Sequence, residues 1–229
     1  MRLSPGTQNK WKVQRYFGDL ADDYDESRIS EWQRYFQKLL VERIQCTPDQ
    51  KVLDVGCGTG WAVEKLALRN PESAIYGIDI SPEMIRIANK RAPSHSNLEF
   101  NVGDAEKLDF PDEEFDYIMS SHAFRHCPDP AKALAEFFRV LKVGGKLLIL
   151  DFCRDIQNPL LRVVASARRL VPSRNTRGYY ASNELRELML NSGFPGAHIS
   201  LKVEKFLFLN KLITSEVLVE GRKSTEGKS

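Results

Sequence analysis

The sequence lacks the patterns by which several classes of protein are identified. Its four cysteines, Cys46, Cys57, Cys127 and Cys153, include no C-x-x-C pair, which argues against both a zinc site and a disulfide framework. No stretch approaches the roughly 20 apolar residues of a membrane-spanning helix, and the opening residues MRLSPGTQNK lack the apolar centre of a signal peptide. We therefore expect a cytoplasmic protein with reduced thiols and no metal site.

An excess of charge of one sign is also lacking. Lysine and arginine total 33 against 31 acidic residues, so the overall charge gives no reason to expect a nucleic-acid partner. The 229 residues, 42% of them hydrophobic, are enough for one domain with a sizeable core.

Strand and helix patterns alternate along most of the chain. Apolar strand-like runs occur at 51–56, 74–80, 98–102, 115–121 and 144–152, and helical patterns separate most of them. Ser81 and Asp129, each followed by a proline, are the expected N-caps of two of these helices. This alternation predicts an α/β fold with a doubly wound, mostly parallel sheet and helices on both faces. HISLKVEKF and SEVLVEGRK then alternate like an antiparallel hairpin at the C-terminal end.

Segments outside this alternation define the expected domain organisation. Residues 1–45 carry two amphipathic helical segments and the acid-rich stretch DLADDYDE, and we expect a helical lid there. Residues 46–222 form the main domain, with a basic helical insert at about 155–180, and 223–229 form a disordered tail.

The stretch VLDVGCGTGW predicts a strand, a tight turn and the start of a helix. Its glycines, Gly56, Gly58 and Gly60, do not fit the G-x-G-x-x-G turn of dinucleotide-binding proteins, because Trp61 holds the third glycine's place. No Gly-Lys-Ser/Thr follows, so the turn is not a phosphate-binding P-loop either. Taken alone, the turn fits a tight connection as well as a ligand site.

Acidic residues that follow the strands favour a ligand site. Asp54 is placed to meet a cationic amino group, and Asp79, about twenty residues after the turn, is placed to bind ribose hydroxyls. Asp104 follows the third strand and could accept a hydrogen bond from an exocyclic amine, or could simply cap a turn. Ile80 and Met84 could enclose a flat base, although Met84 could equally be core.

Five stretches in order resemble the motifs of class I S-adenosylmethionine-dependent methyltransferases: VLDVGCGTG, GIDISPEMI, GDAEKLDF, FDYIMSSHAFRH and RVLKVGGKLLILDF. The resemblance covers roughly Tyr16 to Phe194 and is nearest to the ubiquinone/menaquinone C-methyltransferases. It implies a Rossmann-like fold of seven strands, the last antiparallel, and S-adenosyl-L-methionine as the cofactor. The sequence after the fifth strand resembles the quinone enzymes less, so the substrate does not follow from the resemblance.

The resemblance also implies roles for particular residues. Asp54 and the turn Gly56, Cys57, Gly58 and Gly60 would hold the methionine part of the cofactor, Asp79 the ribose, and Asp104 with the Ala105 amide the adenine. Tyr24 would close over the cofactor, and Ser120 and Ser121 would border the sulfonium.

His122 and His126 follow the fourth strand and are the candidates for a general base. Because the methyl group of a sulfonium is already activated, alignment of the acceptor matters most and a base is not required. Either histidine could instead be structural.

The basic insert carries Arg162, Arg168, Arg169, Arg174 and Arg177, with no acidic residue between Asp155 and Glu184. Such a segment could contact an anionic membrane surface, an acidic carrier protein or an anionic substrate, or could be a solvated helix face.

The predicted function is therefore methyl transfer to a small-molecule acceptor, hydrophobic or quinone-like, by C- or O-methylation. A nucleic-acid or protein methyltransferase is disfavoured by the neutral charge and by the lack of an N/D/S-P-P-Y/F sequence, and a nucleotide-binding oxidoreductase by Trp61. The oligomeric state stays open.

Overall fold

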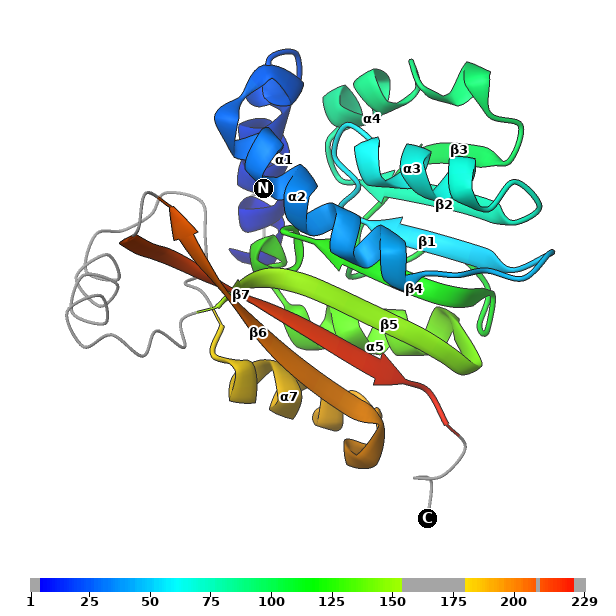
Figure 1. Cartoon of the computed structure of the whole chain (residues 1–229), viewed down its shortest axis with the longest axis vertical. Coiled ribbons are helices and arrows are strands. Elements are labelled where there is room, and N and C mark those ends of the chain that lie inside the picture. The colour runs from blue at the N-terminus through cyan, green and yellow to red at the C-terminus, as the bar shows by residue number, and fades with distance from the viewer. Residues whose placement is uncertain (1–4, 154–179, 209–210, 225–229) are drawn as a thin grey trace.

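The computed structural model describes residues 5–153, 180–208 and 211–224, and in them one sheet of seven strands forms in the order β3-β2-β1-β4-β5-β7-β6 (Figure 1). The first five strands are parallel, and β7 runs antiparallel to its neighbours β5 and β6. The predicted doubly wound sheet and its C-terminal antiparallel hairpin are confirmed. The strands are β1 (Lys51–Val55), β2 (Ala74–Asp79), β3 (Leu98–Val102), β4 (Phe115–Ser121), β5 (Leu141–Cys153), β6 (Ile199–Phe208) and β7 (Lys211–Arg222).

Helices cover both faces of the sheet. On one face lie α2 (Arg28–Arg43), α3 (Trp61–Arg69) and α4 (Pro82–Ala88), and on the other lie α5 (Pro130–Val140) and α7 (Ser182–Asn191). The predicted caps are present: the side chain of Ser81 accepts a hydrogen bond from the Met84 amide, and that of Asp129 from the Lys132 amide.

Two apolar cores sandwich the sheet, and neighbouring residues of a strand belong to different cores. Val52 of β1 packs in the core under α2, α3 and α4, whereas Leu53 packs in the core under α5 and α7. This double burial explains why the central strands read as unbroken apolar runs and not as alternating ones.

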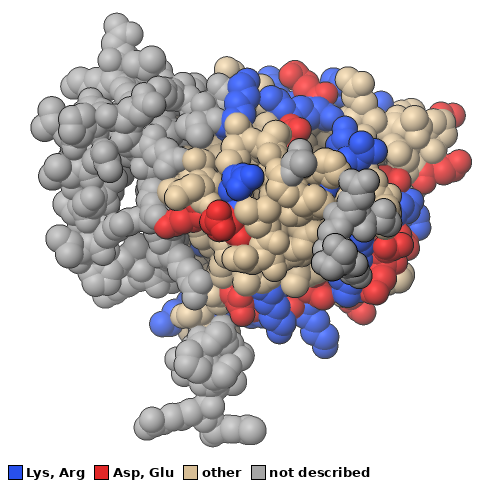
Figure 2. All heavy atoms as spheres, turned by 90° about the horizontal axis from the view of Figure 1, so that it is seen from below, with Lys and Arg blue, Asp and Glu red and all other residues tan. Residues whose placement is uncertain are grey.

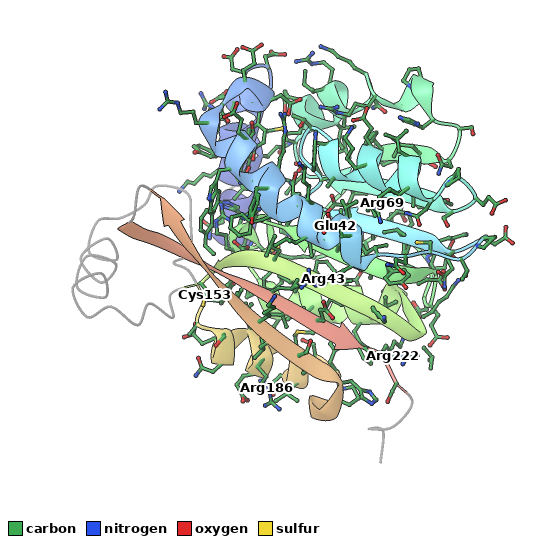
Figure 3. The ribbon with its side chains drawn as sticks, viewed as in Figure 1. Glu42, Arg43, Arg69, Cys153, Arg186 and Arg222 are labelled. Atoms are coloured by element: carbon green, nitrogen blue, oxygen red, sulfur yellow. The ribbon has the colours of Figure 1, made fainter. Side chains whose placement is uncertain are left out.

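The N-terminal segment crosses the end of the sheet where the parallel strands finish. It consists of α1 (Pro5–Leu20), the short 3-10 helix η1 (Tyr24–Glu26) and α2. Asp22, just after α1, forms an ion pair with Arg86 of α4. Arg43 at the end of α2, labelled in Figure 3, forms one with Glu220 of β7 at 3.1 Å. The segment is therefore tied to both halves of the sheet.

The predicted basic insert lies outside the described residues except for its last residue, Tyr180, and so does the tail from residue 225. Cys153, at the end of β5 (Figure 3), forms a parallel bridge with Tyr180. Within the ranges that are described, no helix is both long and apolar enough to cross a lipid bilayer.

Candidate functional site

A cavity opens at the carboxyl ends of the parallel strands. It lies where the strand order reverses between β1 and β4, the position at which open α/β sheets bind their ligands. From the sheet side it is lined by Val55, Gly56, Cys57, Gly58, Thr59, Asp79, Ile80, Met84, Asp104, Ala105, Glu106, Ser120, Ser121, His122 and His126. From the N-terminal segment it is lined by Lys10, Val13, Phe17, Tyr24, Asp25, Ser30, Gln33, Arg34 and Gln37. All the sequence-predicted site residues are in this lining except Asp54 and Gly60.

The three glycines of the first turn have positive φ angles, +80° at Gly56, +55° at Gly58 and +80° at Gly60, which other residues rarely adopt. A Cβ at Gly58 would have no atom within 4 Å, so the turn is open to the cavity there. A Cβ at Gly60 would lie 2.5 Å from the Phe100 ring. Gly60 therefore allows β3 to pack against the turn, and the structure does not place it in the lining where a cofactor contact was predicted.

Asp79 is held in place by the backbone at the end of β2. Its Oδ2 accepts a hydrogen bond from the Gly58 amide and its Oδ1 from the Ser81 amide, both at 2.9 Å. Burial raises the pKa of the carboxyl, and the backbone donors oppose this. Each oxygen keeps a lone pair for a further donor, so the group can accept two hydroxyl hydrogen bonds from a ligand in the cavity.

Asp54 lies one residue below the lining, with 2% of its surface exposed. Its Oδ1 has no hydrogen-bond partner among the described residues, and burial, together with the charge of Asp79, raises its pKa to about 8. A buried carboxylate oxygen without a donor is costly. A ligand that brings a cationic group would fit this position.

Asp104 caps its turn and also lies in the cavity lining. Its Oδ1 accepts a hydrogen bond from the Glu106 amide at 2.9 Å, which caps the turn, while the carboxylate still lines the cavity. Lys10 of α1 lies 2.6 Å from Asp104 Oδ2 and 2.7 Å from Glu106 Oε2. Lys10 could not be predicted as a site residue, because nothing in its local pattern relates it to Asp104, 94 positions away.

Tyr24 and Asp25 of η1 connect the N-terminal segment to the cavity wall. The Tyr24 hydroxyl donates to Gln33 Oε1 at 2.7 Å. Asp25 accepts hydrogen bonds from Thr59 Oγ1 at 2.7 Å and from one nitrogen each of Arg34 and Arg91 at 2.8 Å. Asp25 was also missed, although it follows Tyr24 directly in the acid-rich stretch that was taken as a possible lid.

The end of β4 presents polar side chains, and the backbone of the next residue, His122, is strained. Ser120 Oγ donates to the Val55 carbonyl at 2.8 Å, and Ser121 Oγ lies 3.0 Å from His122 Nδ1. His122 has a φ of +55°, unusual for a residue with a side chain, and only 4% of its surface is exposed. Its ring packs among Trp32, Phe36 and Phe152 at centroid distances of 5.3 to 6.3 Å.

His126 lies at the other end of the same loop, with its ring edge-on to Phe17 of α1 at 5.0 Å. Both candidate bases are thus in the cavity lining, His122 beside the strand ends and His126 against the N-terminal helix.

Two thiols also line the cavity, Cys57 and Cys127. Burial raises the pKa of Cys127 to about 12, so this thiol is protonated at neutral pH. In the part of the chain that is described, no three His, Cys, Asp or Glu side chains are grouped as a metal site would require.

The sequence of this chain is similar to those of known methyltransferases. A family model described as a methyltransferase domain matches residues 53–149. A demethylmenaquinone methyltransferase of Staphylococcus aureus strain JH9 is 34% identical over 165 residues, which are 70% of this chain and 67% of the relative. Phosphoethanolamine N-methyltransferase 1 of Arabidopsis thaliana is 35% identical over 170 residues, 67% of this chain and 33% of the relative.

The alignments do not all span the relatives. The chain covers less than two thirds of two further demethylmenaquinone methyltransferases, 63% and 64% of their length. Among solved structures, a methyltransferase from Thermotoga maritima, described as a possible histamine N-methyltransferase, has a TM-score of 0.68 at 24% identity, over 93% of this chain and all of the other. This similarity supports the fold alone.

Proposed function

The chain belongs to the family of S-adenosylmethionine-dependent methyltransferases, and on this basis we propose that it transfers the methyl group of S-adenosylmethionine to a small-molecule acceptor. The observation that carries the proposal is Asp79, which two backbone amides hold at the edge of the cavity, beside a glycine turn with open space at Gly58. A carboxylate so placed suits the hydroxyls of a ribose.

The donors and acceptors of the lining fit the remaining parts of this cofactor. We assign the methionine part to the glycine turn, where Asp54 would meet its ammonium group and Tyr24 would cover it. The adenine would lie between Ile80 and Met84, with its amino group at Asp104 and a ring nitrogen at the Ala105 amide. The buried, unpartnered Asp54 Oδ1 supports this assignment, because an ammonium group would satisfy it.

The bound cofactor would supply an activated methyl group. The task of the protein is then to hold a nucleophile in line with that group and to keep water out. Val13 and Phe17 of α1 cover the cavity with apolar surface. Ser120 and Ser121, the last residues of β4, would border the sulfonium where the acceptor approaches.

His122 is the residue that we assign as general base. It lines the cavity, it is buried and its backbone is held at positive φ, as is common for residues at active sites. The contact between Ser121 Oγ and Nδ1 would orient the ring, so that Nε2 could receive a proton from the acceptor. His126 is the second candidate.

The acceptor that we favour is hydrophobic or quinone-like, since relatives are named for methylating demethylmenaquinone. A small amine is the alternative, supported by the relative named for phosphoethanolamine. Nucleic acid is disfavoured by the near-neutral balance of 33 basic and 31 acidic residues. On the face seen in Figure 2, basic and acidic side chains are interspersed.

We further propose that the protein acts in the cytoplasm and that its arginine-rich insert contacts an anionic membrane surface or an acidic carrier protein. Changing Arg168, Arg169, Arg174 and Arg177 to glutamine should then lower turnover and leave cofactor affinity intact. Flotation with anionic liposomes separates the two partners, since only membrane binding predicts co-flotation. Normal turnover in the quadruple variant would show that the arginines of the insert have no role in methyl transfer.

Calorimetric titration with S-adenosylhomocysteine and with NAD tests the cofactor. We expect S-adenosylhomocysteine to bind and NAD not to bind. Binding of NAD without binding of S-adenosylhomocysteine would overturn the proposal. A small-molecule extract incubated with methyl-labelled S-adenosylmethionine would then identify the acceptor, with a demethylated quinone and phosphoethanolamine as defined candidates.

A further inference from the structure

We propose that Arg34 of α2 binds the carboxylate of the methionine part of the cofactor, an inference that rests on the proposed function. The cofactor carries one carboxylate, and burying it in a cavity requires a cation or several hydrogen-bond donors. The glycine turn does not supply these donors, because its amides at Gly56, Cys57, Gly58 and Gly60 already donate to Ile78, Asp79 and Cys57. Asp54 and Asp79 are acidic and cannot supply a cation.

The positions of the basic side chains point to Arg34. Among the described residues, the lysines and arginines in the cavity lining are Lys10 and Arg34. Lys10 is bound by Asp104 and Glu106 after β3, at the end where the adenine would lie. Arg34 instead shares the carboxylate of Asp25 with Thr59 of the glycine turn, and its guanidinium lies 6.0 Å from the Trp61 ring. It is therefore at the methionine end.

The Arg34 guanidinium has N–H donors available for a ligand. Its hydrogen bonds both come from Nη2, to the carbonyl and to the side chain of Asp25. Its Nη1 and Nε make no hydrogen bond within the described part of the chain. The fork of a guanidinium can bind a second carboxylate through such free N–H groups without losing the first.

The charge of Arg34 is also incompletely balanced. Asp25 divides its negative charge between Arg34 and Arg91. Arg91 has a second acidic partner, Glu64, at 3.0 Å, and donates through Nε to the Thr59 carbonyl. Arg91 is thus fully engaged, whereas Arg34, with 27% of its side chain exposed beside the cavity, retains capacity for an anion.

The test compares two ligands that differ in the amino acid. S-adenosylhomocysteine carries the carboxylate, and 5′-methylthioadenosine keeps the adenosine and the sulfur but lacks the amino acid. Arg34→Met should weaken S-adenosylhomocysteine about 10- to 100-fold, as for a lost charge-assisted hydrogen bond, and leave 5′-methylthioadenosine within about twofold of wild type. Arg34→Lys should recover part of the loss, because it keeps the charge without the fork.

Lys38→Met is the matched control, because Lys38 is an exposed cation on the same helix and is absent from the lining. It should bind both ligands as the wild type does. Equal weakening of both ligands by Arg34→Met would show that Arg34 acts only by holding Asp25, and unchanged binding of both would show no role. Either result overturns the inference. A wild type that binds neither ligand would refute the proposed function, and the inference with it.

Discussion

Phe100 packs against Gly60 and Gly77, and this packing predicts how much stability the protein loses when each glycine is changed to alanine. A Cβ at Gly60 would lie 2.5 Å from Phe100 Cζ, and a Cβ at Gly77 would lie 2.7 Å from Cδ1 of the same ring. Phe100 is 5% exposed, so its ring has little room to move away. Gly60 also has a φ of +80°, whereas Gly58 has positive φ and open space.

These differences set the expected losses of unfolding free energy. Gly58→Ala adds only backbone strain, about 1–2 kcal/mol. Gly77→Ala adds only overpacking, about 1–3 kcal/mol. Gly60→Ala adds both and should cost about 2–5 kcal/mol, the largest loss of the three, because the two effects act at one residue. Urea denaturation of each folded variant measures the three values.

Ligand binding should rank the same variants differently. The methyl group of Gly58→Ala would project into the cavity, so S-adenosylhomocysteine should bind about tenfold or more weakly, which corresponds to about 1.4 kcal/mol. Gly77→Ala should bind it normally once folded. Phe100→Leu should partly restore stability to Gly60→Ala and leave the loss at Gly58→Ala unchanged. If Gly60→Ala is no less stable than Gly58→Ala, or Phe100→Leu gives no rescue, packing is not the role of Gly60.

Three further predictions concern the acidic and basic groups of the cavity. Asp79→Asn should weaken S-adenosylhomocysteine by about 1–3 kcal/mol, because hydrogen bonds between the charged carboxylate and the ribose are lost; calorimetry that finds wild-type affinity would place the ribose elsewhere. Asp54, with its pKa raised to about 8, keeps a proton in the folded state that the unfolded chain releases above about pH 4, so the free energy of unfolding should fall as pH rises from 4 to 8. Asp54→Asn should remove that loss and be more stabilising at pH 8 than at pH 4, and a pH-independent effect in thermal melts would contradict the burial argument. His122→Gln should lower turnover about 100-fold or more while cofactor affinity stays unchanged, with His126→Gln as the comparison; full activity of the His122 variant in a methyl-transfer assay would mean that no base acts there.

Much of the fold followed from local pattern. The alternation of strand and helix predicted the parallel sheet, and Ser81 and Asp129 marked helix starts because a cap is a contact between near neighbours in the chain. The turn at Gly58 and the acid at Asp79 were also predictable, since the order of β1, its turn and β2 places them at one edge of the sheet.

The sequence could not determine contacts between segments that are far apart in the chain, because such contacts leave no local sequence pattern. Lys10 meets Asp104 across 94 positions, and Arg91 meets Asp25 across 66. Gly60 looked like a ligand contact beside Gly58, yet the ring of Phe100 takes up the space next to it. Periodicity and capping depend on neighbours along the chain, so they can be inferred from it. Which side chains close the cavity depends on how the N-terminal segment packs over the strand ends. That packing forms only once the sheet has formed, so it cannot be inferred from local sequence.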